Sequence, residues 1–252
     1  GVKLRNEVMA STKNANDAWI YGGPEAATLL IQGTIPANRS SFAVKGAIHH
    51  PDACFRAELE KRLKGKGITL DKQKIEDGER HALLTTVSPF LKDIVYYTNK
   101  NSINLFAEAL GELISPTDYA RTVKAELSGM GIDSCGITLK DASGLSPANA
   151  VPAEVFTDLL IWAKGHLSDA FVASLPQGNV DWGLRIYSDH PVLRENVIAK
   201  TGSMSGVRAL AGYLKTQRGE TLAFTILVNN YVGDPVKVQE IIRDLLKEFA
   251  DK

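Results

Sequence analysis

The sequence predicts an α+β protein in which helices cover an antiparallel sheet, and three observations support this fold class. Strand-like segments dominate the first third, helix-like segments fill the middle, and three long strand-like segments lie close together in the last third. Long adjacent strands followed by a helix favour an antiparallel sheet with helices on its faces. The strongly polar residues 71–80 separate the first region from the rest, so we predict domains over residues 1–78 and 79–252.

The first region is predicted to be rich in strands and to contain one helix. Three of its segments carry branched and aromatic residues and are separated by glycine, proline and asparagine: Ala18–Gly22, Thr28–Ile35 and Ser41–Ile48. A helix should begin at Pro51, because apolar residues recur every four positions after it, and should end at the glycines and lysines of residues 64–67. A short strand is predicted at Ala82–Val87, after the polar stretch.

The middle and last regions predict four helices, then three strands, then a closing helix. The helices are expected at Pro89–Asn99, Asn104–Ile114, Tyr119–Met130 and Pro152–His166. The strands are expected at Val197–Thr201, Val207–Thr216 and Thr221–Val228. The closing helix begins at the Asp234-Pro235 cap. Its apolar residues fall on one stripe: Val238, Ile241, Ile242, Leu245, Leu246 and Phe249.

Composition and charge exclude several classes of partner. The 29 basic residues balance the 29 acidic ones, so no overall field attracts the chain to nucleic acid or anionic lipid, and we expect no nucleic-acid partner. The longest apolar runs, such as Leu222–Val228, have the length of a strand and are far too short to span a membrane. The chain opens with Gly-Val-Lys and no methionine, so the missing export signal says nothing about its compartment.

The cysteines and histidines predict neither a metal site nor a bound cofactor. Cys54 and Cys135 are far apart, and two structural thiols are favoured over one disulfide. The five histidines have no metal-ligand spacing: His49, His50, His81, His166 and His190. The glycine-rich residues 202–206 follow a strand but lead into another strand instead of a helix, so they do not form a phosphate-binding loop.

Lys200-Thr201-Gly202, at the end of a predicted strand, has the residue types of a carboxylate-binding edge. Lys200 supplies a compact positive charge and Thr201 a hydroxyl donor. Gly202 would let a substrate backbone approach the strand without a Cβ in the way, and a strand edge can pair with an extended peptide. Taken alone, the tripeptide favours a simpler interpretation, a strand that ends in a turn.

Ser102-Ile103-Asn104 lies where two predicted helices meet. Ser102 or Asn101 is a candidate helix cap, which is the common role of such residues. The functional interpretation puts Ser102 and Asn104 on one side of a tight turn, where the hydroxyl can pass a proton and the amide can hold a substrate carbonyl. Penicillin-binding proteins and class A β-lactamases combine Ser-x-x-Lys, Ser-Asp-Asn and Lys-Thr-Gly motifs. This chain has the second motif in the looser Ser-x-Asn form and the third intact, in the same order.

Several longer segments resemble the low-molecular-mass penicillin-binding proteins of the peptidase S13 family, which are D-alanyl-D-alanine carboxypeptidases and endopeptidases. The resemblance runs over nearly the whole chain and keeps the family's order. One match is imperfect, because Ala142 replaces a glycine of the family's Asp-Gly-Ser-Gly-Leu stretch. The segments are Ile20–Gly22, Gly33–Pro36, Val44–Ile48, Ser102–Glu108, Lys140–Ser146, Ser174–Pro176, Asp181–Arg185 and Lys200–Tyr213.

The resemblance implies the penicillin-binding, serine β-lactamase-like transpeptidase fold with a helical subdomain. It implies that this fold is incomplete at its N-terminus and that residues 1–78 are the remainder of an inserted β-rich domain. The implied partners are peptidoglycan stem peptides ending in D-Ala-D-Ala, β-lactams and the N-terminal segment of the same protein. The implied location is the periplasm or another extracytoplasmic space.

The resemblance also assigns roles in acyl transfer to individual residues. Ser102 would act as a proton shuttle, and Asn104 would hold the substrate carbonyl. Lys200 and Thr201 would bind the terminal carboxylate, beside Gly202. A backbone N–H near Ser203 would supply half of the oxyanion hole.

The family's nucleophile is expected in a Ser-x-x-Lys motif near the N-terminus, and no serine of this chain has a lysine three residues on. Ser11 comes nearest, but Lys13 is one residue early and would face another side of a helix. We therefore expect the motif upstream of Gly1 and expect this chain alone to be inactive. The alternative function is a non-catalytic peptidoglycan-binding protein of the same fold. A β-lactamase or esterase of that fold explains the inserted-domain segments poorly.

Overall fold

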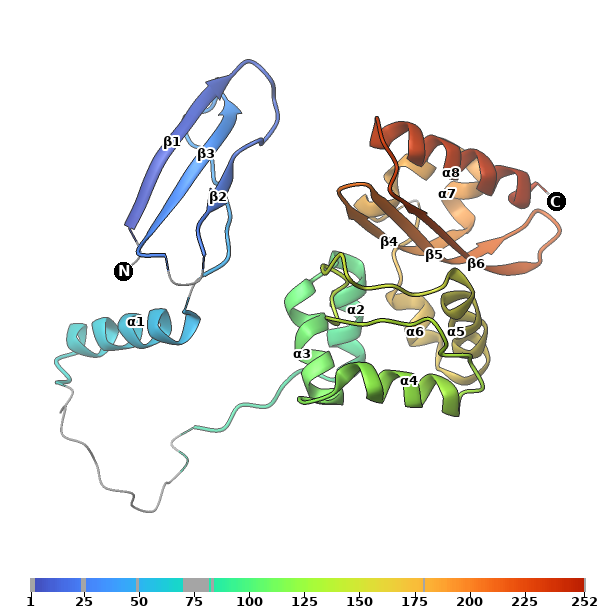
Figure 1. Ribbon diagram of the computed structural model, residues 1–252, viewed down its shortest axis with the longest axis horizontal. Coiled ribbons are helices and arrows are strands. Elements are labelled where there is room, and N and C mark those ends of the chain that lie inside the picture. Colours follow the sequence, from blue (N-terminus) through green and yellow to red (C-terminus); the bar gives the residue numbers. More distant parts are fainter. Residues whose placement is uncertain are drawn as a thin grey trace. The chain divides into compact units, whose positions relative to one another are not determined.

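The computed structural model describes residues 3–23, 26–48, 50–69, 82, 84–178 and 180–251 (Figure 1). It divides into two compact units, Gly1–Leu83 and Leu84–Lys252, which are described separately below as unit 1 and unit 2.

Unit 1 contains a three-stranded sheet with the strand order β1-β3-β2. Strand β3 (Thr28–Pro36) pairs in parallel with β1 (Lys3–Ser11) and antiparallel with β2 (Trp19–Tyr21). The predicted strands at Ala18–Gly22 and Thr28–Ile35 are confirmed, whereas β1 was not predicted. Most β1 side chains are exposed on both faces, so the strand lacks the alternation that marks a half-buried strand.

Two other predicted strands, at Ser41–Ile48 and Ala82–Val87, are wrong. Residues 41–48 alternate between exposed and half-buried positions at first, but no strand among the described residues pairs with them. Ala82 and residues 84–87 have no regular structure, and Leu83 lies outside the described residues. The predicted helix is confirmed as α1 (Pro51–Gly65), with Pro51 at its first position, where a missing N–H costs nothing.

The sheet of unit 2 is an antiparallel meander of the strands β4 (Val197–Met204), β5 (Val207–Lys215) and β6 (Thr221–Asn229). All three strands were predicted. The two residues Ser205 and Gly206 connect β4 to β5, and Gly206 has φ 70°, in the left-handed region that tight hairpin turns require. Strand β4 is therefore an edge strand of this sheet.

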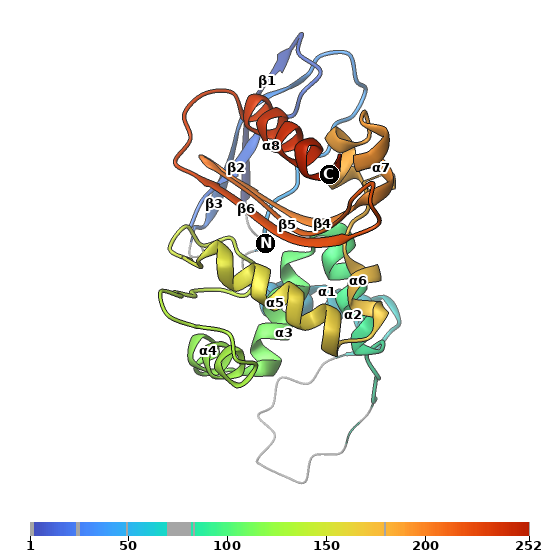
Figure 2. The ribbon, with the colours of Figure 1, turned by 90° about the vertical axis from the view of Figure 1, so that its right-hand side faces the viewer.

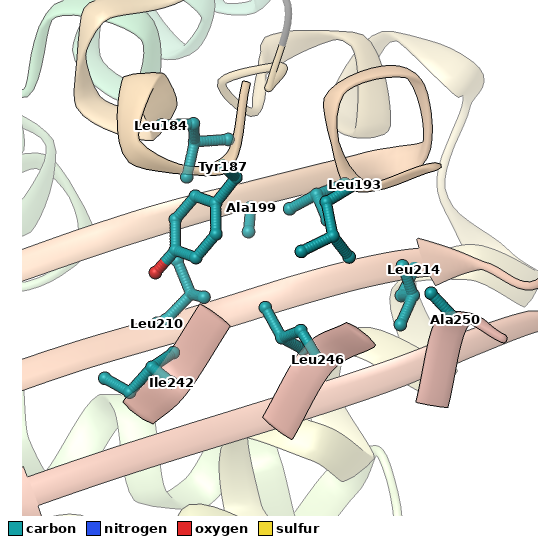
Figure 3. Packing of buried hydrophobic residues seen from close by; sticks show 10 residues of the cluster. Leu184, Tyr187, Leu193, Ala199, Leu210, Leu214, Ile242, Leu246 and Ala250 are labelled. Carbon is teal, nitrogen blue, oxygen red and sulfur yellow. The ribbon is translucent and has the colours of Figure 1, made fainter. Parts of the chain in front are cut away.

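One face of this sheet packs against α8 (Pro235–Ala250), α7 (Pro191–Asn196) and the 3₁₀-helix η1 (Trp182–Tyr187) (Figure 2). Helix α8 was predicted, and Asp234 caps it by accepting the N–H of Val236 at 2.8 Å. Figure 3 shows α8 side chains pointing at the strands. The largest fully buried side chains of this core are Leu184, Leu193, Val197, Leu210, Leu214 and Leu246.

The other face of the sheet packs against two helices, α5 (Ala153–His166) and α6 (Asp169–Ser174). Leu160, Leu175 and Tyr213 form the core there, and the Tyr213 hydroxyl donates to the Leu160 carbonyl oxygen at 2.6 Å. The remaining helices of unit 2 are α2 (Leu91–Asn101), α3 (Asn104–Ile114) and α4 (Tyr119–Gly129). A third core joins α4 to α5: Leu127, Ile132, Ile137 and Val155.

The predicted α+β class is therefore confirmed, with helices on both faces of the antiparallel sheet of unit 2. The short elements α6, α7 and η1 were not predicted. Each has six residues, too few for an apolar repeat to show. Cys54 and Cys135 are both exposed, and neither takes part in a disulfide. Among the described residues, no helix combines the length and the apolar composition that crossing a bilayer requires.

Candidate active site

Lys200 contacts Ser102 although the two residues lie 98 positions apart in the sequence. The Lys200 Nζ donates to the Ser102 Oγ at 2.9 Å and to the Thr201 carbonyl oxygen at 2.7 Å. Lys200 leaves the same face of β4 as Ile198, which packs in the core toward α5 and α6. Burial lowers the pKa of the Lys200 ammonium below its ordinary value of 10.5. The structure thus joins the two motifs singled out in the sequence.

Ser102 is the C-cap residue of α2 and has left-handed backbone angles, φ 52° and ψ 52°. The cap residue of α3 is Ile103, without a side-chain cap hydrogen bond, and the Asn101 amide donates to the Tyr97 carbonyl oxygen at 3.3 Å. Ser102 is thus a helix cap, but at the C-terminus of α2, and neither Ser102 nor Asn101 caps the N-terminus of α3. A non-glycine residue in this conformation costs about 1–3 kcal/mol and is often found at functional sites.

Asn104 is the first residue of α3 and is exposed, two residues after Ser102 in the turn between α2 and α3. Within the part of the chain that the structure describes, its amide has no hydrogen-bond partner. Its carbonyl and amino groups are thus available to an external ligand.

The outer edge of β4 is covered at its start and open toward its end, within the described residues. Residues 176–178 lie along the start: the Ala199 N–H donates to the Pro176 carbonyl oxygen at 2.9 Å, and the Gly178 N–H donates to the Val197 carbonyl oxygen at 3.0 Å. Because alternate strand residues direct their backbone groups to the same edge, the N–H of Thr201 and of Ser203 also point outward. The edge available for pairing therefore begins next to Lys200.

Thr201 and Gly202 occupy crowded positions on β4. The Thr201 side chain leaves the face opposite to Lys200, and a Cβ added to Gly183 of η1 would lie 3.3 Å from the Thr201 Oγ1. A Cβ added to Gly202 would lie 3.3 Å from the Ala209 Cβ on β5. Gly202 thus relieves crowding inside the sheet, in addition to its proposed role toward a substrate. The Ser203 side chain is exposed.

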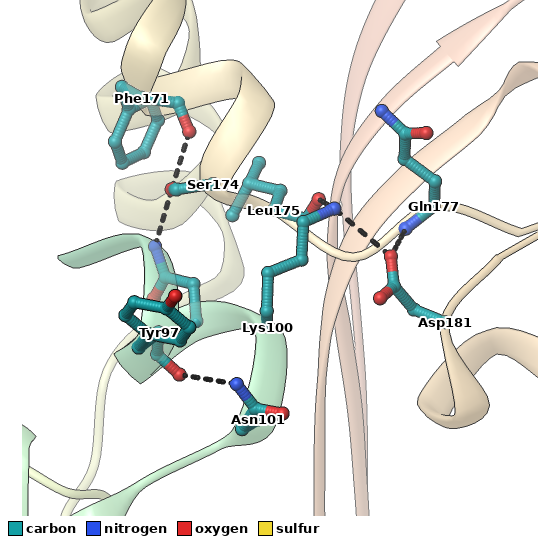
Figure 4. A network of polar contacts seen from close by, with 9 residues as sticks. Tyr97, Lys100, Asn101, Phe171, Ser174, Leu175, Gln177 and Asp181 are labelled. Atoms are coloured by element: carbon teal, nitrogen blue, oxygen red, sulfur yellow. Dashed lines mark hydrogen bonds and ion pairs between the residues drawn. The ribbon is translucent and has the colours of Figure 1, made fainter. Parts of the chain in front are cut away.

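A polar network that includes Lys100, two residues before Ser102, was not assigned any role from the sequence (Figure 4). The Lys100 Nζ lies 3.0 Å from the Asp181 Oδ2, and the side chains are only 11% and 18% exposed. On the same helix, the Asn99 amide donates to the Ser174 Oγ at 2.8 Å. In the sequence, only the position of Lys100 two residues before Ser102 could have drawn attention to this network. Its partner Asp181 lies 81 residues further on.

Glu108 of α3 holds the loop formed by residues 141–146. Its carboxylate accepts the N–H groups of Ala142, at 3.3 Å, and Ser143, at 2.9 Å. Asp141 folds the loop by accepting the N–H groups of Gly144 and Ser146. Among the residues that the structure describes, no group of three or more His, Cys, Asp or Glu side chains is arranged to hold a metal ion.

A model of the D-Ala-D-Ala carboxypeptidase 3 (S13) family matches residues 4–252. The chain belongs to this family. The family indicated by the sequence segments is therefore confirmed. Two curated relatives are a D-alanyl-D-alanine carboxypeptidase of Actinomadura sp. (strain R39), 31% identical over 251 residues, and the D-alanyl-D-alanine carboxypeptidase DacB of Haemophilus influenzae, 30% identical over 224 residues. These alignments cover 88% and 81% of this chain but 45% and 46% of the relatives, so the chain spans about half their length.

Solved structures share the fold of this chain. Penicillin binding protein 4 (dacB) of H. influenzae, complexed with a β-lactam, matches with a TM-score of 0.81 and 25% identity, over 100% of this chain and 64% of its own. An extended-spectrum β-lactamase shares the fold, with a TM-score of 0.53 and 17% identity over 64% of this chain and 63% of its own. The predicted penicillin-binding, β-lactamase-like fold is confirmed.

Proposed function

We propose that the full-length protein is a serine-type D-Ala-D-Ala carboxypeptidase or endopeptidase that acts on peptidoglycan stem peptides through an acyl-enzyme. The hydrogen bond between the Lys200 Nζ and the Ser102 Oγ carries this proposal. It joins a hydroxyl group, which is able to transfer a proton, to an ammonium group whose pKa is lowered by burial. Family membership supplies the reaction class. Residues 79–252 would form the C-terminal part of the catalytic domain, and residues 1–78 the remainder of an inserted domain.

In the proposed reaction, a serine Oγ from a segment upstream of Gly1 bonds to the carbonyl carbon between the two D-alanines. The C–N bond breaks, and the proton of the attacking serine passes through the Ser102 hydroxyl to the leaving amine. Water then attacks the ester carbon, releases the shortened peptide and returns the proton to the serine. The Lys200 ammonium stabilises negative charge that develops on the Ser102 oxygen during transfer.

Lys200 can serve Ser102 and a substrate carboxylate together. An ammonium group has three N–H donors, and two are used on the Ser102 Oγ and the Thr201 carbonyl oxygen. The third remains for the terminal carboxylate of the substrate. The lowered pKa of Lys200 reflects poor hydration, which strengthens its interaction with an arriving anion. In this proposal Thr201 assists through its hydroxyl.

The open edge of β4 would hold the substrate backbone as an added strand. Main-chain pairing there places the scissile carbonyl near the outward N–H of Ser203, which would supply half of the oxyanion hole. Asn104, exposed on the neighbouring turn, would hold another substrate carbonyl. β-Lactams would acylate the same serine as substrate mimics. Because peptidoglycan lies outside the cytoplasm, the protein would act in the periplasm or another extracytoplasmic space.

The test measures acylation of the full-length protein by a fluorescent penicillin and release of D-alanine from a D-Ala-D-Ala peptide. Ser102→Ala and Lys200→Met should each lower the acylation rate constant by about 10²-fold or more, the range expected for lost proton-transfer catalysis. Ser128→Ala, an exposed serine on α4, is the matched control and should leave the rate unchanged. A Ser102→Ala protein that acylates at the wild-type rate would refute the proposed role.

A non-catalytic peptidoglycan-binding protein is the alternative, because no serine of this chain precedes a lysine by three residues. Ser11 ends β1 and its Oγ accepts the Lys13 N–H at 3.1 Å, so the two form a turn and not a helical pair. The isolated chain should not be labelled covalently by the fluorescent penicillin. A full-length protein that binds a D-Ala-D-Ala peptide but forms no adduct would establish the alternative. Faster turnover of β-lactams than of the peptide would instead indicate a β-lactamase.

A further inference from the structure

Lys100 lies in the last turn of α2, two residues before Ser102, and forms an ion pair with Asp181. The Lys100 Nζ donates to the Asp181 Oδ2 at 3.0 Å and to the Leu175 carbonyl oxygen at 2.6 Å. Both charged side chains are largely shielded from water. Figure 4 shows Lys100 reaching from α2 across to the segment that follows α6.

The same segment is bonded to the strand that carries Lys200. Asp181 accepts the N–H of Gln177 at 2.7 Å, and Gln177 forms a β-bridge with Ile198 of β4. The Ala199 N–H, one residue before Lys200, donates to the Pro176 carbonyl oxygen at 2.9 Å. An unbroken series of hydrogen bonds therefore runs from Lys100, two residues before Ser102, to the backbone next to Lys200.

A second link runs parallel to the first. The Asn99 amide donates to the Ser174 Oγ, and this hydroxyl, fully buried, donates to the Phe171 carbonyl oxygen at 2.6 Å. Two consecutive residues of the last turn of α2 are thus tied to the end of α6. This attachment can hold Ser102 in its left-handed conformation, which an exposed turn would not favour by itself.

We propose that Lys100 and Asp181 are positioning residues that set the Ser102 hydroxyl opposite the Lys200 ammonium. Shielded ion pairs add little net stability, because desolvation offsets their attraction, so geometry is the property that this pair supplies here. A displacement of about 1 Å at a reacting group can lower a rate by about 10²-fold. The inference rests on the proposed acyl-transfer function and names residues that neither motif contains.

The test is a double-mutant cycle on acylation of the full-length protein by the fluorescent penicillin. Lys100→Met should lower the rate constant by about 10- to 100-fold in the wild-type background. In a Ser102→Ala background it should lower the rate by less than about 3-fold, because the residue acts through Ser102. Lys92→Met, an exposed lysine on the same helix, is the matched control and should have no effect in either background.

Asp181→Asn provides a second variant, since the amide keeps a carbonyl oxygen for the Gln177 N–H while removing the charge. It should show the same dependence on Ser102. Equal losses in both backgrounds would indicate general destabilisation and overturn the inference, as would unchanged rates. A crystal structure of Lys100→Met should show the Ser102 Oγ and Lys200 Nζ more than about 3.5 Å apart, beyond hydrogen-bond range. An unchanged separation would overturn the inference whether or not the wild-type protein forms an adduct. Failure of the wild-type protein to form an adduct would instead count against the proposed function.

Discussion

Gly212 lies where β5 approaches β4 too closely for any side chain. It pairs with Ala199, the residue before Lys200. A Cβ added at Gly212 would lie 2.5 Å from the Ala199 Cα and 2.6 Å from the Ala199 Cβ, and would also clash with the Ile198 carbonyl oxygen. Paired residues on neighbouring strands normally hold their Cβ atoms about 4.5–5.5 Å apart, so Gly212→Ala must displace β4 by roughly 1 Å or more.

Two effects of Gly212→Ala follow from this displacement. The clash involves backbone atoms, which cannot rotate away, so the free energy of unfolding of the chain should fall by about 3 kcal/mol. The shift also moves Lys200 relative to Ser102, so acylation of the full-length protein should fall by about 10²-fold at temperatures where the variant remains folded. Urea unfolding and fluorescent-penicillin kinetics measure the two effects.

Gly165→Ala is the matched control. Gly165 lies near the end of α5 with open space where a Cβ would be, so the exchange should be neutral or stabilising by up to about 1 kcal/mol. A Gly212→Ala variant as stable and as active as Gly165→Ala would contradict the close approach of the β4 and β5 backbones beside Lys200.

Three further predictions concern the core and the charge of unit 2. Leu246 is 2% exposed, so Leu246→Ala should lower the unfolding free energy in urea denaturation by about 2–5 kcal/mol. Ile241 on the same helix is 68% exposed, so Ile241→Ala should lower it far less. Equal losses would contradict the assigned buried face of α8. Tyr213→Phe should cost about 1–3 kcal/mol in the same assay, because it leaves the buried Leu160 carbonyl oxygen without its donor, and a neutral exchange would contradict that hydrogen bond. The pKa of Lys200 is lowered in the folded state, so between that value and 10.5 the unfolded chain binds more protons and stability rises with pH. Relative to Lys200→Met, the wild-type unfolding free energy should therefore increase across this window, and parallel pH curves would contradict the burial of the ammonium.

The elements that could be predicted from the sequence are those whose pattern is local. Helix α8 has a capping Asp234 and a proline at its first position. Of its predicted apolar stripe, Val238, Ile242 and Leu246 face the core, whereas Ile241 is exposed. Strand β1 has no such pattern, because it is held by parallel pairing with β3 and not by burial of one face. For residues 41–48 the prediction failed in the opposite way, since their composition suits a strand but no described strand pairs with them.

The candidate site divides in a similar way. Ser102 and Lys200 were found because each lies in a short motif, and their contact follows once unit 2 folds. The contact between Lys100 and Asp181 depends on where the chain returns after α6, and nothing in either residue's neighbours specifies that partner. The turn conformation of Ser102 was also not predictable, because serine at the junction of two helices usually caps the second one.

Mapping the penicillin adduct on the full-length protein by peptide mass spectrometry tests the central claim most directly. We predict one adduct, on a serine upstream of Gly1 that is followed by a lysine three residues later, and none within residues 1–252. We also predict that Ser102→Ala and Lys200→Met slow adduct formation at that same serine. An adduct on Ser11 or on any other serine of the chain would contradict the account, as would an upstream adduct whose rate is indifferent to both substitutions.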